Sequence, residues 1–245
     1  MSAHVVRAAD RPVTVTEWLT SRHGFSFGDH YDPADTHHGV LLVHNDEVVA
    51  PGRGFDTHPH RETEIVTWVL SGTLVHQDSR GHSGLIHPGL AQRMSAGTGI
   101  LHSERNDRGP TADAAASEPV HYVQMWLLPD ETGLDPSYEQ RDVSSELAAG
   151  GLLPLASGDP AHDSAIRIRN AGATLWVARL AAGERATVPA GTYTHLFVTA
   201  GAAEVEGTVL QTADTLRATG FAGSVLTALT DTEILLWTMH SALGE

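Results

Sequence analysis

The sequence predicts an all-β protein built from two antiparallel β-sandwich barrels, and three observations support this. Short apolar segments alternate with turns rich in Gly, Pro, Asp and Asn, the spacing typical of sandwiches and barrels. A strand, a Ser-Gly turn and a second strand around Gly72 are echoed around Gly201 as LFVTAGAAEVEG. Strands do not alternate with long helices, which argues against a parallel sheet.

The expected strands are short, apolar and separated by turn signals such as Ser71-Gly72 and Pro88-Gly89. They are Val40–His44, Glu64–Leu70, Gly72–Asp78, Val120–Leu128, Thr174–Leu180, His195–Ala200, Ala203–Val205 and Glu233–Met239. One short helix is expected near Ser144–Ala149.

Two stretches, Arg105–Pro119 and Ser144–Ala165, are expected to be loops because turn residues dominate them. The second is the expected domain connection. We therefore expect an N-terminal domain over residues 1–143 and a C-terminal domain over residues 144–245, each long enough for one small β-barrel.

The charge balance excludes several classes of partner. The chain carries 15 basic and 30 acidic residues, a net charge of −15 with His neutral. A polyanion of this kind is a poor ligand for nucleic acid or for an anionic membrane surface. No apolar run approaches the ~20 residues of a membrane span, and the first residues lack the apolar core of a secretory signal. We expect a cytoplasmic protein without nucleic-acid or membrane partners.

Residue usage also limits the chemistry. The absence of Cys excludes disulfides, thiolate nucleophiles, iron–sulfur clusters and thiolate zinc sites. All 15 basic residues are Arg, so Schiff-base and Walker-type lysine chemistry are excluded as well. His is abundant instead, and 13 of the 16 His lie at or before His121. This distribution favours a His and carboxylate metal site in the first half of the chain.

The first candidate motif runs from Gly52 through His58-Pro59-His60 to Glu64. Residues i and i+2 of an extended strand point to the same face, so His58 and His60 are expected to direct two imidazoles at one point. Pro59 favours this geometry because it biases His58 toward an extended conformation. Taken alone, such a pair also fits a surface or packing role.

The second candidate motif is Gly97-Thr-Gly99-Ile-Leu-His102-Ser-Glu104, in which His102 and Glu104 again share one face. Three His and one carboxylate would form an open site with room for water, O₂ or a bidentate substrate. Paired imidazoles suit Fe, Ni, Cu, Zn or Mn.

These motifs resemble those of the cupin superfamily. The residues that match its two motifs are Gly52, His58, His60, Glu64 and Gly72, followed by Gly89, Gly97, His102 and Asn106. Two departures are Ser95, where Pro is usual, and Gly72, which lies one residue later than the commonest spacing. More locally, THPHRETEIVTWVLSGTLVHQDSRGHSG, MSAGTGILHSERN, FSFGDHYDP and PSYEQR resemble the pirin family. The resemblance covers roughly residues 18–141 and is faint beyond them.

The resemblance implies a bicupin, in which two β-sandwich (double-stranded β-helix) barrels follow one another and only the N-terminal one holds a metal. Carried over position by position, the implied metal ligands are His58, His60, His102 and Glu104. The implied metal is one divalent transition ion, iron(II) first, with Ni, Co, Mn, Cu or Zn as alternatives. Glu64, a ligand in many other cupins, is expected beside the ligands rather than among them.

The C-terminal half is expected to be a degenerate copy without metal. Aligning Gly201 on Gly72 without gaps places Thr187 and Pro189 where His58 and His60 stand. His195 and His240 are isolated in apolar strands, where core or surface roles are expected.

Other residues of the first half complete the expected site. Phe55, Trp68 and Met94 are candidate pocket walls, because ligand pockets are lined mainly by apolar and aromatic groups. His44 or His76 is expected to support a ligand through a hydrogen bond. We expect structural packing from the aromatic residues of the FSFGDHYDP segment, Phe25, Phe27 and Tyr31.

Three functions remain open at this point. Bacterial pirins resemble quercetin 2,3-dioxygenases, which open a flavonol ring with O₂ and release CO, and the resemblance implies a small aromatic, flavonol-like substrate. Glu104 would then bind the metal through one oxygen and take the flavonol hydroxyl proton with the other. The second function is a metal- or redox-sensing regulator that binds a protein partner, and the third is other cupin chemistry on another substrate.

Overall fold

The computed structural model describes residues 2–107 and 118–244, which form two compact units. The first, here called the N-terminal unit, comprises Pro12–Thr36 and Leu41–Asp142. The C-terminal unit comprises residues 2–11, His37–Val40 and residues 143–244. The N-terminal residues and the short segment His37–Val40 thus group with the later part of the chain.

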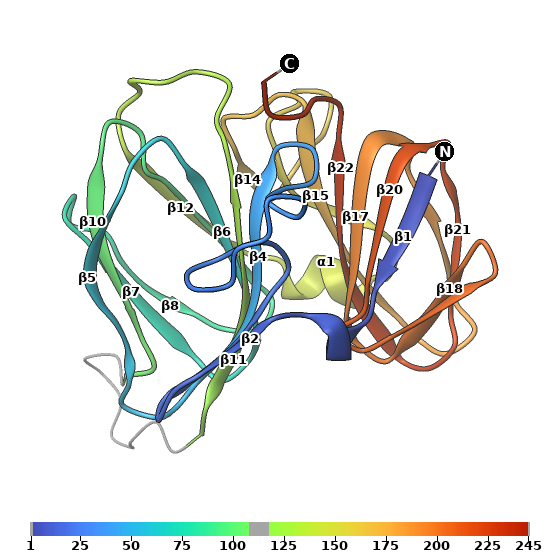
Figure 1. The fold of residues 1–245 in the computed structure, drawn as a ribbon, viewed down its shortest axis with the longest axis horizontal. Coiled ribbons are helices and arrows are strands. Elements are labelled where there is room, and N and C mark those ends of the chain that lie inside the picture. The colour runs from blue at the N-terminus through green and yellow to red at the C-terminus, as the bar shows by residue number, and fades with distance from the viewer. Residues whose placement is uncertain (1, 108–117, 245) are drawn as a thin grey trace. The chain divides into compact units, whose positions relative to one another are not determined.

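The N-terminal unit contains a seven-stranded and a four-stranded sheet, both antiparallel (Figure 1). The larger sheet has, in order, β12 (Ser137–Asp142), β9 (Leu90–Ser95), β6 (Glu64–Ser71), β11 (Val120–Leu127), β4 (Leu41–Val49), β3 (Leu19–His23) and β2 (Val13–Val15). The smaller sheet has β5 (Gly54–His60), β10 (Ile100–Arg105), β7 (Leu74–Asp78) and β8 (Ser83–Ile86).

The C-terminal unit repeats this division into seven and four strands. The larger sheet has β1 (Ser2–Val6), β20 (Thr215–Phe221), β17 (Gly191–Ala200), β22 (Thr232–Met239), β15 (Ala173–Leu180), β13 (Leu153–Ser157) and β14 (Ile166–Arg167). The smaller sheet has β16 (Arg185–Val188), β21 (Ser224–Ala228), β18 (Ala202–Val205) and β19 (Thr208–Gln211). Among the described residues, the helices are the 3₁₀ turn Ala8–Asp10 and α1 (Ser144–Ala148).

The smaller sheets and the five central strands of the larger sheets share one topology in the two units, which confirms the predicted bicupin fold. Each smaller sheet joins its strands in the same sequence order, β5-β10-β7-β8 in one unit and β16-β21-β18-β19 in the other. The echoed Ser-Gly and Ala-Gly turns are also equivalent: Gly72 and Gly201 have φ of +77° and +82°, which favours glycine. No helix in the described part of the chain has the length and apolar character needed to cross a membrane.

The structure corrects two of the expected element boundaries. The predicted strand Val40–His44 continues through Asn45, Asp46 and Glu47, so β4 ends only at Val49. The predicted loop Ser144–Ala165 contains strand β13. In both cases polar residues or Pro suggested a turn, while pairing with neighbouring strands keeps the backbone extended. Of the other predicted loop, residues 108–117 lie outside the described residues.

A row of polar residues crosses the larger sheet of the N-terminal unit. His23, Asn45, Gln124, Thr67 and Gln92 lie directly opposite one another on five neighbouring strands, and all are buried. We call these residues the polar row. It separates two apolar clusters, one of Leu19, Val49, Val69, Leu74, Ile86, Leu90, Val120 and Tyr122, the other of Ile65, Met94, Ala96 and Ile100. The interior of this unit is therefore polar at one level, which is unusual for a core.

Candidate metal centre

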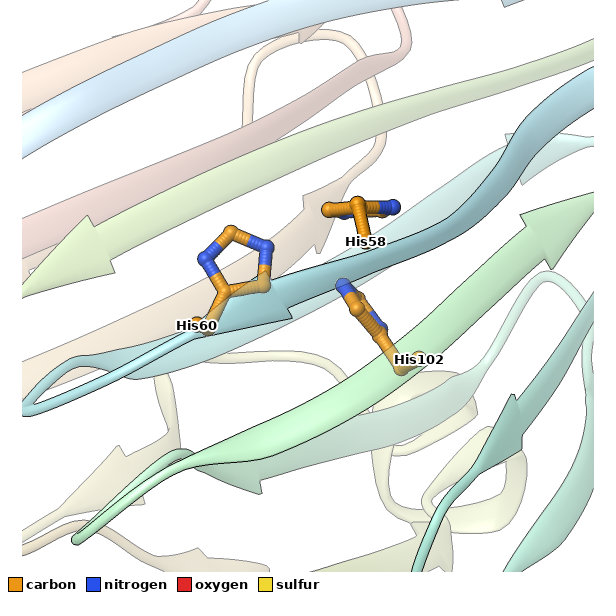
Figure 2. A group of neighbouring side chains, drawn as sticks. All are labelled: His58, His60 and His102. Atoms are coloured by element: carbon orange, nitrogen blue, oxygen red, sulfur yellow. The ribbon is translucent and has the colours of Figure 1, made fainter.

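Three histidines gather on two adjacent strands of the smaller sheet. His58 and His60 lie on β5, and His102 lies on β10 directly opposite His58. The ring centroids are 4.9 Å apart for His58 and His60, 4.5 Å for His58 and His102, and 4.9 Å for His60 and His102. Figure 2 shows the three rings converging, and one nitrogen of each lies within 4.8 Å of the others. The i, i+2 prediction for His58 and His60 matches this geometry.

Glu104 joins this group through a break in strand pairing. The register between β10 and β5 shifts between His102 and Glu104, so Glu104 lies opposite Phe55. Its carboxylate is buried, and an oxygen of it lies within 4.8 Å of nitrogens of His102 and His76. The structure therefore groups His102 with His58 and His60 in one set and with His76 and Glu104 in a second.

The donor atoms of this cluster have the chemistry that a divalent cation needs. His60 Nε2, His102 Nε2 and Glu104 Oε1 are buried, and none has a hydrogen-bond partner among the described residues. An unsatisfied buried polar atom costs about 1–3 kcal/mol, so three together require an explanation. A metal ion bound by these nitrogen and oxygen atoms supplies one, since neutral imidazole and carboxylate are common transition-metal ligands.

The electrostatics keep the imidazoles of His60 and His102 neutral, as ligation requires. Burial, together with the neighbouring rings of His102 and His58, lowers the pKa of His60 to about 4. Burial, His58 and His76 lower the pKa of His102 to about 3. Both residues are therefore unprotonated at neutral pH, with a lone pair free for a cation.

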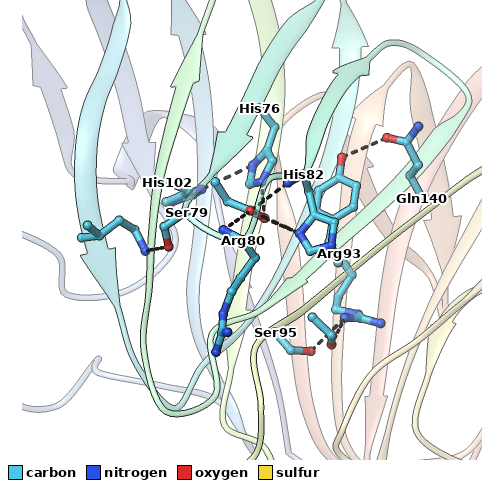
Figure 3. Close-up of polar contacts among 12 residues, drawn as sticks. His76, Ser79, Arg80, His82, Arg93, Ser95, His102 and Gln140 are labelled. Carbon is cyan, nitrogen blue, oxygen red and sulfur yellow. Dashed lines mark hydrogen bonds and ion pairs between the residues drawn. The ribbon is translucent and has the colours of Figure 1, made fainter.

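Hydrogen bonds fix the orientation of two of the rings. His58 donates from Nδ1 to the carbonyl of Asp56 at 2.8 Å, which leaves Nε2 as the ligand atom. His102 Nδ1 lies 3.4 Å from His76 Nδ1, and His76 Nε2 lies 3.4 Å from Asp78 Oδ2 (Figure 3). If Nε2 of His102 binds the metal, its Nδ1–H donates to His76, and the Nε2–H of His76 donates to Asp78. The expectation that His76 supports a ligand fits this geometry.

Asp78 anchors this chain of contacts. Its buried carboxylate accepts hydrogen bonds from His82 Nδ1 at 2.9 Å and from the backbone N–H groups of Arg80 and His82. Burial alone would raise the pKa of Asp78, but these hydrogen bonds outweigh it and hold the pKa below its usual value. Asp78 therefore remains ionised and able to accept from His76.

Gln124 of the polar row holds the second oxygen of Glu104. The indole N–H of Trp126 donates to Gln124 Oε1 at 2.9 Å, so the amide of Gln124 is oriented with its NH₂ toward Glu104. Gln124 Nε2 then donates to Glu104 Oε2 at 2.7 Å. One carboxylate oxygen is thus positioned by hydrogen bonding while the other is left for a cation.

A cavity of about 320 Å³ opens beside these groups. Its lining includes His58 and Glu104 together with the aromatic residues Phe27, Phe55 and Trp126. Phe27 and Trp126 meet edge to face, with ring centroids 5.7 Å apart. The volume lies at the lower end of the range for small-molecule sites, and the aromatic walls suit a flat ring system.

The predicted pocket walls are only partly correct. Phe55 lines the cavity, but Trp68 and Met94 are fully buried and do not. Phe27, expected to serve packing, lines the cavity instead, while Phe25 is buried and Tyr31 is exposed.

The remaining candidates take other positions. Glu64 accepts a hydrogen bond from Ser95 at 2.8 Å and belongs to neither ligand group among the described residues. His44 is buried on β4, His195 is buried on β17, and His240 is exposed.

Several residues around the cavity escaped the sequence analysis, notably Gln124, Trp126, Asn45 and Glu47. Gln124 and Trp126 lie on an expected strand at spacing i, i+2, so their shared face was readable from the sequence. The contact between Gln124 and Glu104 was not readable from the sequence, because Glu104 belongs to a strand of the other sheet.

The C-terminal unit has apolar or hydroxyl residues at the equivalent positions. With Gly201 aligned on Gly72, Thr187 replaces His58, and its partner across the strand pair is Val225. The same alignment places Leu196 where Thr67 of the polar row stands. Strand pairing then sets Leu196 opposite Leu216 and Leu236, and Leu236 opposite Trp176. These three leucines belong to one continuous apolar core.

Comparison with known proteins assigns the fold to a family. Residues 5–127 match the family model described as Pirin, and residues 155–239 match that of the quercetinase C-terminal cupin domain. The chain belongs to the pirin family. A Mycobacterium tuberculosis H37Rv relative, provisionally named a quercetin 2,3-dioxygenase, is 53% identical to this pirin over 245 residues, 100% of this chain and 98% of the relative. Quercetin 2,3-dioxygenase of Escherichia coli K12 is 43% identical over 151 residues, 62% of this chain and 61% of that protein.

Two solved structures resemble this pirin over almost its whole length. The crystal structure of YhhW from Escherichia coli has a TM-score of 0.89 at 33% identity and covers 100% of both chains. The structure of the bacterial pirin YhhW in complex with nickel(II) has a TM-score of 0.87 at 34% identity, covering 98% of this chain and 100% of that one. A relative of this pirin therefore binds a divalent transition metal.

Proposed function

We propose that this pirin binds one divalent transition metal through His58, His60, His102 and Glu104 and cleaves the ring of a flavonol with O₂, releasing CO. The observation that carries the proposal is the set of three buried donor atoms without hydrogen-bond partners, beside a cavity with aromatic walls. The names of the similar proteins support the flavonol as substrate.

The metal, when bound, supplies Lewis acidity toward an oxygen donor of the substrate. The protein supplies the proton acceptor: Glu104 Oε2 has two lone pairs, of which Gln124 uses one, so the other can accept the flavonol 3-hydroxyl proton. Phe27, Phe55 and Trp126 hold the flat ligand and exclude water from it.

Iron(II) is our first choice of metal, and nickel(II) is the alternative that a relative supports. Three imidazoles and one carboxylate accept either ion, as well as Co, Mn, Cu or Zn. Elemental analysis of the protein purified without added metal identifies the native ion.

Turnover tests the proposed reaction directly. Protein loaded in turn with Fe(II), Ni(II), Co(II), Mn(II), Cu(II) or Zn(II) is mixed with quercetin in air, and flavonol absorbance, O₂ uptake and CO release are followed. We expect loss of the flavonol band with at least one metal. Absorbance that persists with every metal contradicts the proposal and favours a regulator, which a pull-down with reduced and oxidised iron would then test.

The ligand assignment has its own test. His58→Ala and His60→Ala should each reduce bound metal from about one ion per chain to a small fraction, because each removes one donor atom from the set. Circular dichroism should remain that of a β protein, and His87→Ala, which changes a half-exposed histidine elsewhere in the same unit, should keep full occupancy. Full metal content in both ligand variants would show that the site is misplaced.

A further inference from the structure

The cavity beside the metal centre contains a second buried carboxyl group, that of Glu47. Glu47 lies on β4, two residues from Asn45 of the polar row, and its side chain is part of the cavity lining. Two residues of a strand span about 7 Å, so Glu47 lies about that distance along the strand from the polar row, whose member Gln124 binds Glu104. The mechanism proposed above does not use this group.

Neutral donors from three adjacent strands hold Glu47 in place. Ser21 on β3 donates to Oε1 at 3.0 Å, and Tyr122 on β11 donates to Oε2 at 2.6 Å. Both lie directly opposite Glu47 in the sheet. Asn45 provides a third hydrogen bond.

The orientation of Asn45 is itself determined by its neighbours. Asn45 Oδ1 can only accept, so His23 donates to it from Nδ1 at 3.0 Å. In the neutral ring His23 Nε2 then accepts from Thr14 Oγ1 at 2.9 Å. The NH₂ group of Asn45 therefore faces Glu47, and the carboxyl sits at the end of an ordered chain of hydrogen bonds.

Burial makes the ionised form of Glu47 energetically unfavourable at this place. Glu47 is 5% exposed, and no cation pairs with it among the described residues. Burial raises its pKa to about 7, and the nearby Glu104 raises it as well. A carboxylate has about four lone-pair positions, of which the three neighbours use three. The remaining one is available to a molecule in the cavity.

We propose that Glu47 determines substrate specificity by accepting a hydrogen bond from a ring hydroxyl of an aromatic substrate, one that is not part of its metal-binding group. The proposal rests on the proposed function for the choice of flavonols as ligands. It adds that the cavity selects polyhydroxylated rings over equally flat rings without such hydroxyls. A site built to hydrogen-bond a hydroxyl rejects the analogue that lacks it, because its buried polar group is left unpaired.

A pair of ligands isolates this interaction. Quercetin and 3-hydroxyflavone share the 3-hydroxyl and 4-carbonyl oxygens, but 3-hydroxyflavone lacks the other ring hydroxyls. Binding of each to the metal-loaded protein is measured without O₂ by the change in flavonol absorbance. We expect the unaltered protein to bind quercetin at least about tenfold more tightly.

The variant Glu47→Gln keeps the size of the side chain but removes its charge, so binding is measured at a pH above the Glu47 pKa of about 7. Hydrogen bonds to charged groups are roughly twice as strong as neutral ones, so the preference for quercetin should fall by roughly fivefold. Glu64→Gln is the matched control, because it neutralises another buried carboxyl of the same unit that does not line the cavity. The control should leave the preference unchanged, and a general loss of packing would affect both ligands equally.

The outcomes separate this proposal from the dioxygenase activity. An unchanged preference in Glu47→Gln overturns the role of Glu47, and so does equal or absent binding of the two ligands by the unaltered protein. A shifted preference without turnover contradicts only the dioxygenase proposal. If Glu47→Gln does not fold, Glu47→Asp, which withdraws the carboxyl by one methylene group, should show the same loss of preference.

Discussion

One oxygen of Glu104 accepts a hydrogen bond from Gln124, while the other has no partner in the described structure. The two oxygens of Glu104 therefore differ in how well each can bind a cation. The unpartnered oxygen is the stronger ligand for a cation, and the hydrogen-bonded one is held in a fixed direction toward the cavity. Trp126 determines which oxygen of Glu104 is hydrogen-bonded, since the Trp126 N–H sets the orientation of the Gln124 amide.

Replacing Gln124 by Leu should therefore lower turnover more than metal content. Leu fills a similar volume but leaves Glu104 Oε2 buried without a donor, at a cost of about 1–3 kcal/mol. We expect kcat to fall by about tenfold while bound metal stays near one ion per chain. Gln92→Leu is the control, because Gln92 belongs to the same polar row but does not line the cavity. Equal kcat losses in both variants would contradict a specific role for Gln124.

At the scale of elements, the candidate metal centre depends on β5 and β10 lying close together at Gly54. A Cβ added to Gly54 would lie 2.3 Å from the carbonyl oxygen of Glu104 and 2.5 Å from Cα of Arg105. Both contacts are with backbone, so the strands would have to separate at the position where β10 supplies Glu104.

Gly54→Ala should accordingly weaken metal binding by at least about tenfold and destabilise the fold by more than the 1–3 kcal/mol of an unfavourable φ alone. Gly81→Ala is a matched control: Gly81 also has positive φ, at +89°, but an added Cβ would meet nothing within 4 Å. Isothermal titration with Ni(II) and thermal unfolding measure the two effects. Metal affinity lost equally in both variants would rule out the strand-spacing argument.

Strand β7 contributes to the same centre through His76 and Asp78. Replacing His76 by Ala removes the ring nitrogen that lies 3.4 Å from His102 Nδ1, so the candidate ligand ring loses a contact that orients it. Partners of this kind are worth about 10–100-fold in metal affinity, and we expect a loss in that range. His82→Ala, which removes only one of the donors to Asp78, should cost less. An unaltered metal affinity in His76→Ala would show that the contact is incidental.

The candidate metal ligands could be located from sequence because they follow the i, i+2 rule along single strands, His58 with His60 and His102 with Glu104. Glu47 and Asn45 could not, because a run of Asn, Asp and Glu indicates a turn unless neighbouring strands pair with it. The split apolar core likewise depends on which strands lie opposite one another, and a linear pattern does not contain that information.

At the scale of the whole molecule, the two units differ in how continuous their apolar cores are. The polar row of the N-terminal unit is leucine-rich at the equivalent positions of the C-terminal unit, whose core is continuous. We propose that the C-terminal unit holds no metal and contributes through its packing.

Strand β1 links the early chain to this C-terminal unit. It pairs with β20 from Ser2 opposite Thr219 to Val6 opposite Thr215, and Arg7 forms an ion pair with Asp214 at 2.7 Å. A chain that starts at Arg11 should lose these contacts and expose the edge of β20.

We expect this truncation to lower the unfolding temperature of the C-terminal unit by roughly 5 °C or more and to increase aggregation. Bound metal, measured after gentle purification, should remain near one ion per chain, because the four proposed ligands belong to the N-terminal unit. Loss of metal together with unchanged thermal stability would contradict this assignment of β1.

The pairing of β1 with β20 also has a consequence for synthesis on the ribosome. β1 is synthesised about two hundred residues before its partner β20, so it remains unpaired with β20 while the N-terminal unit is synthesised. Only Val5 and Val6 of this strand are partly buried, so the unpaired strand exposes little apolar surface that could cause aggregation during synthesis. The strands of the N-terminal unit are all synthesised before β20, so that unit can close first, and the strand pairing of greatest sequence separation among the described residues involves one of the earliest segments.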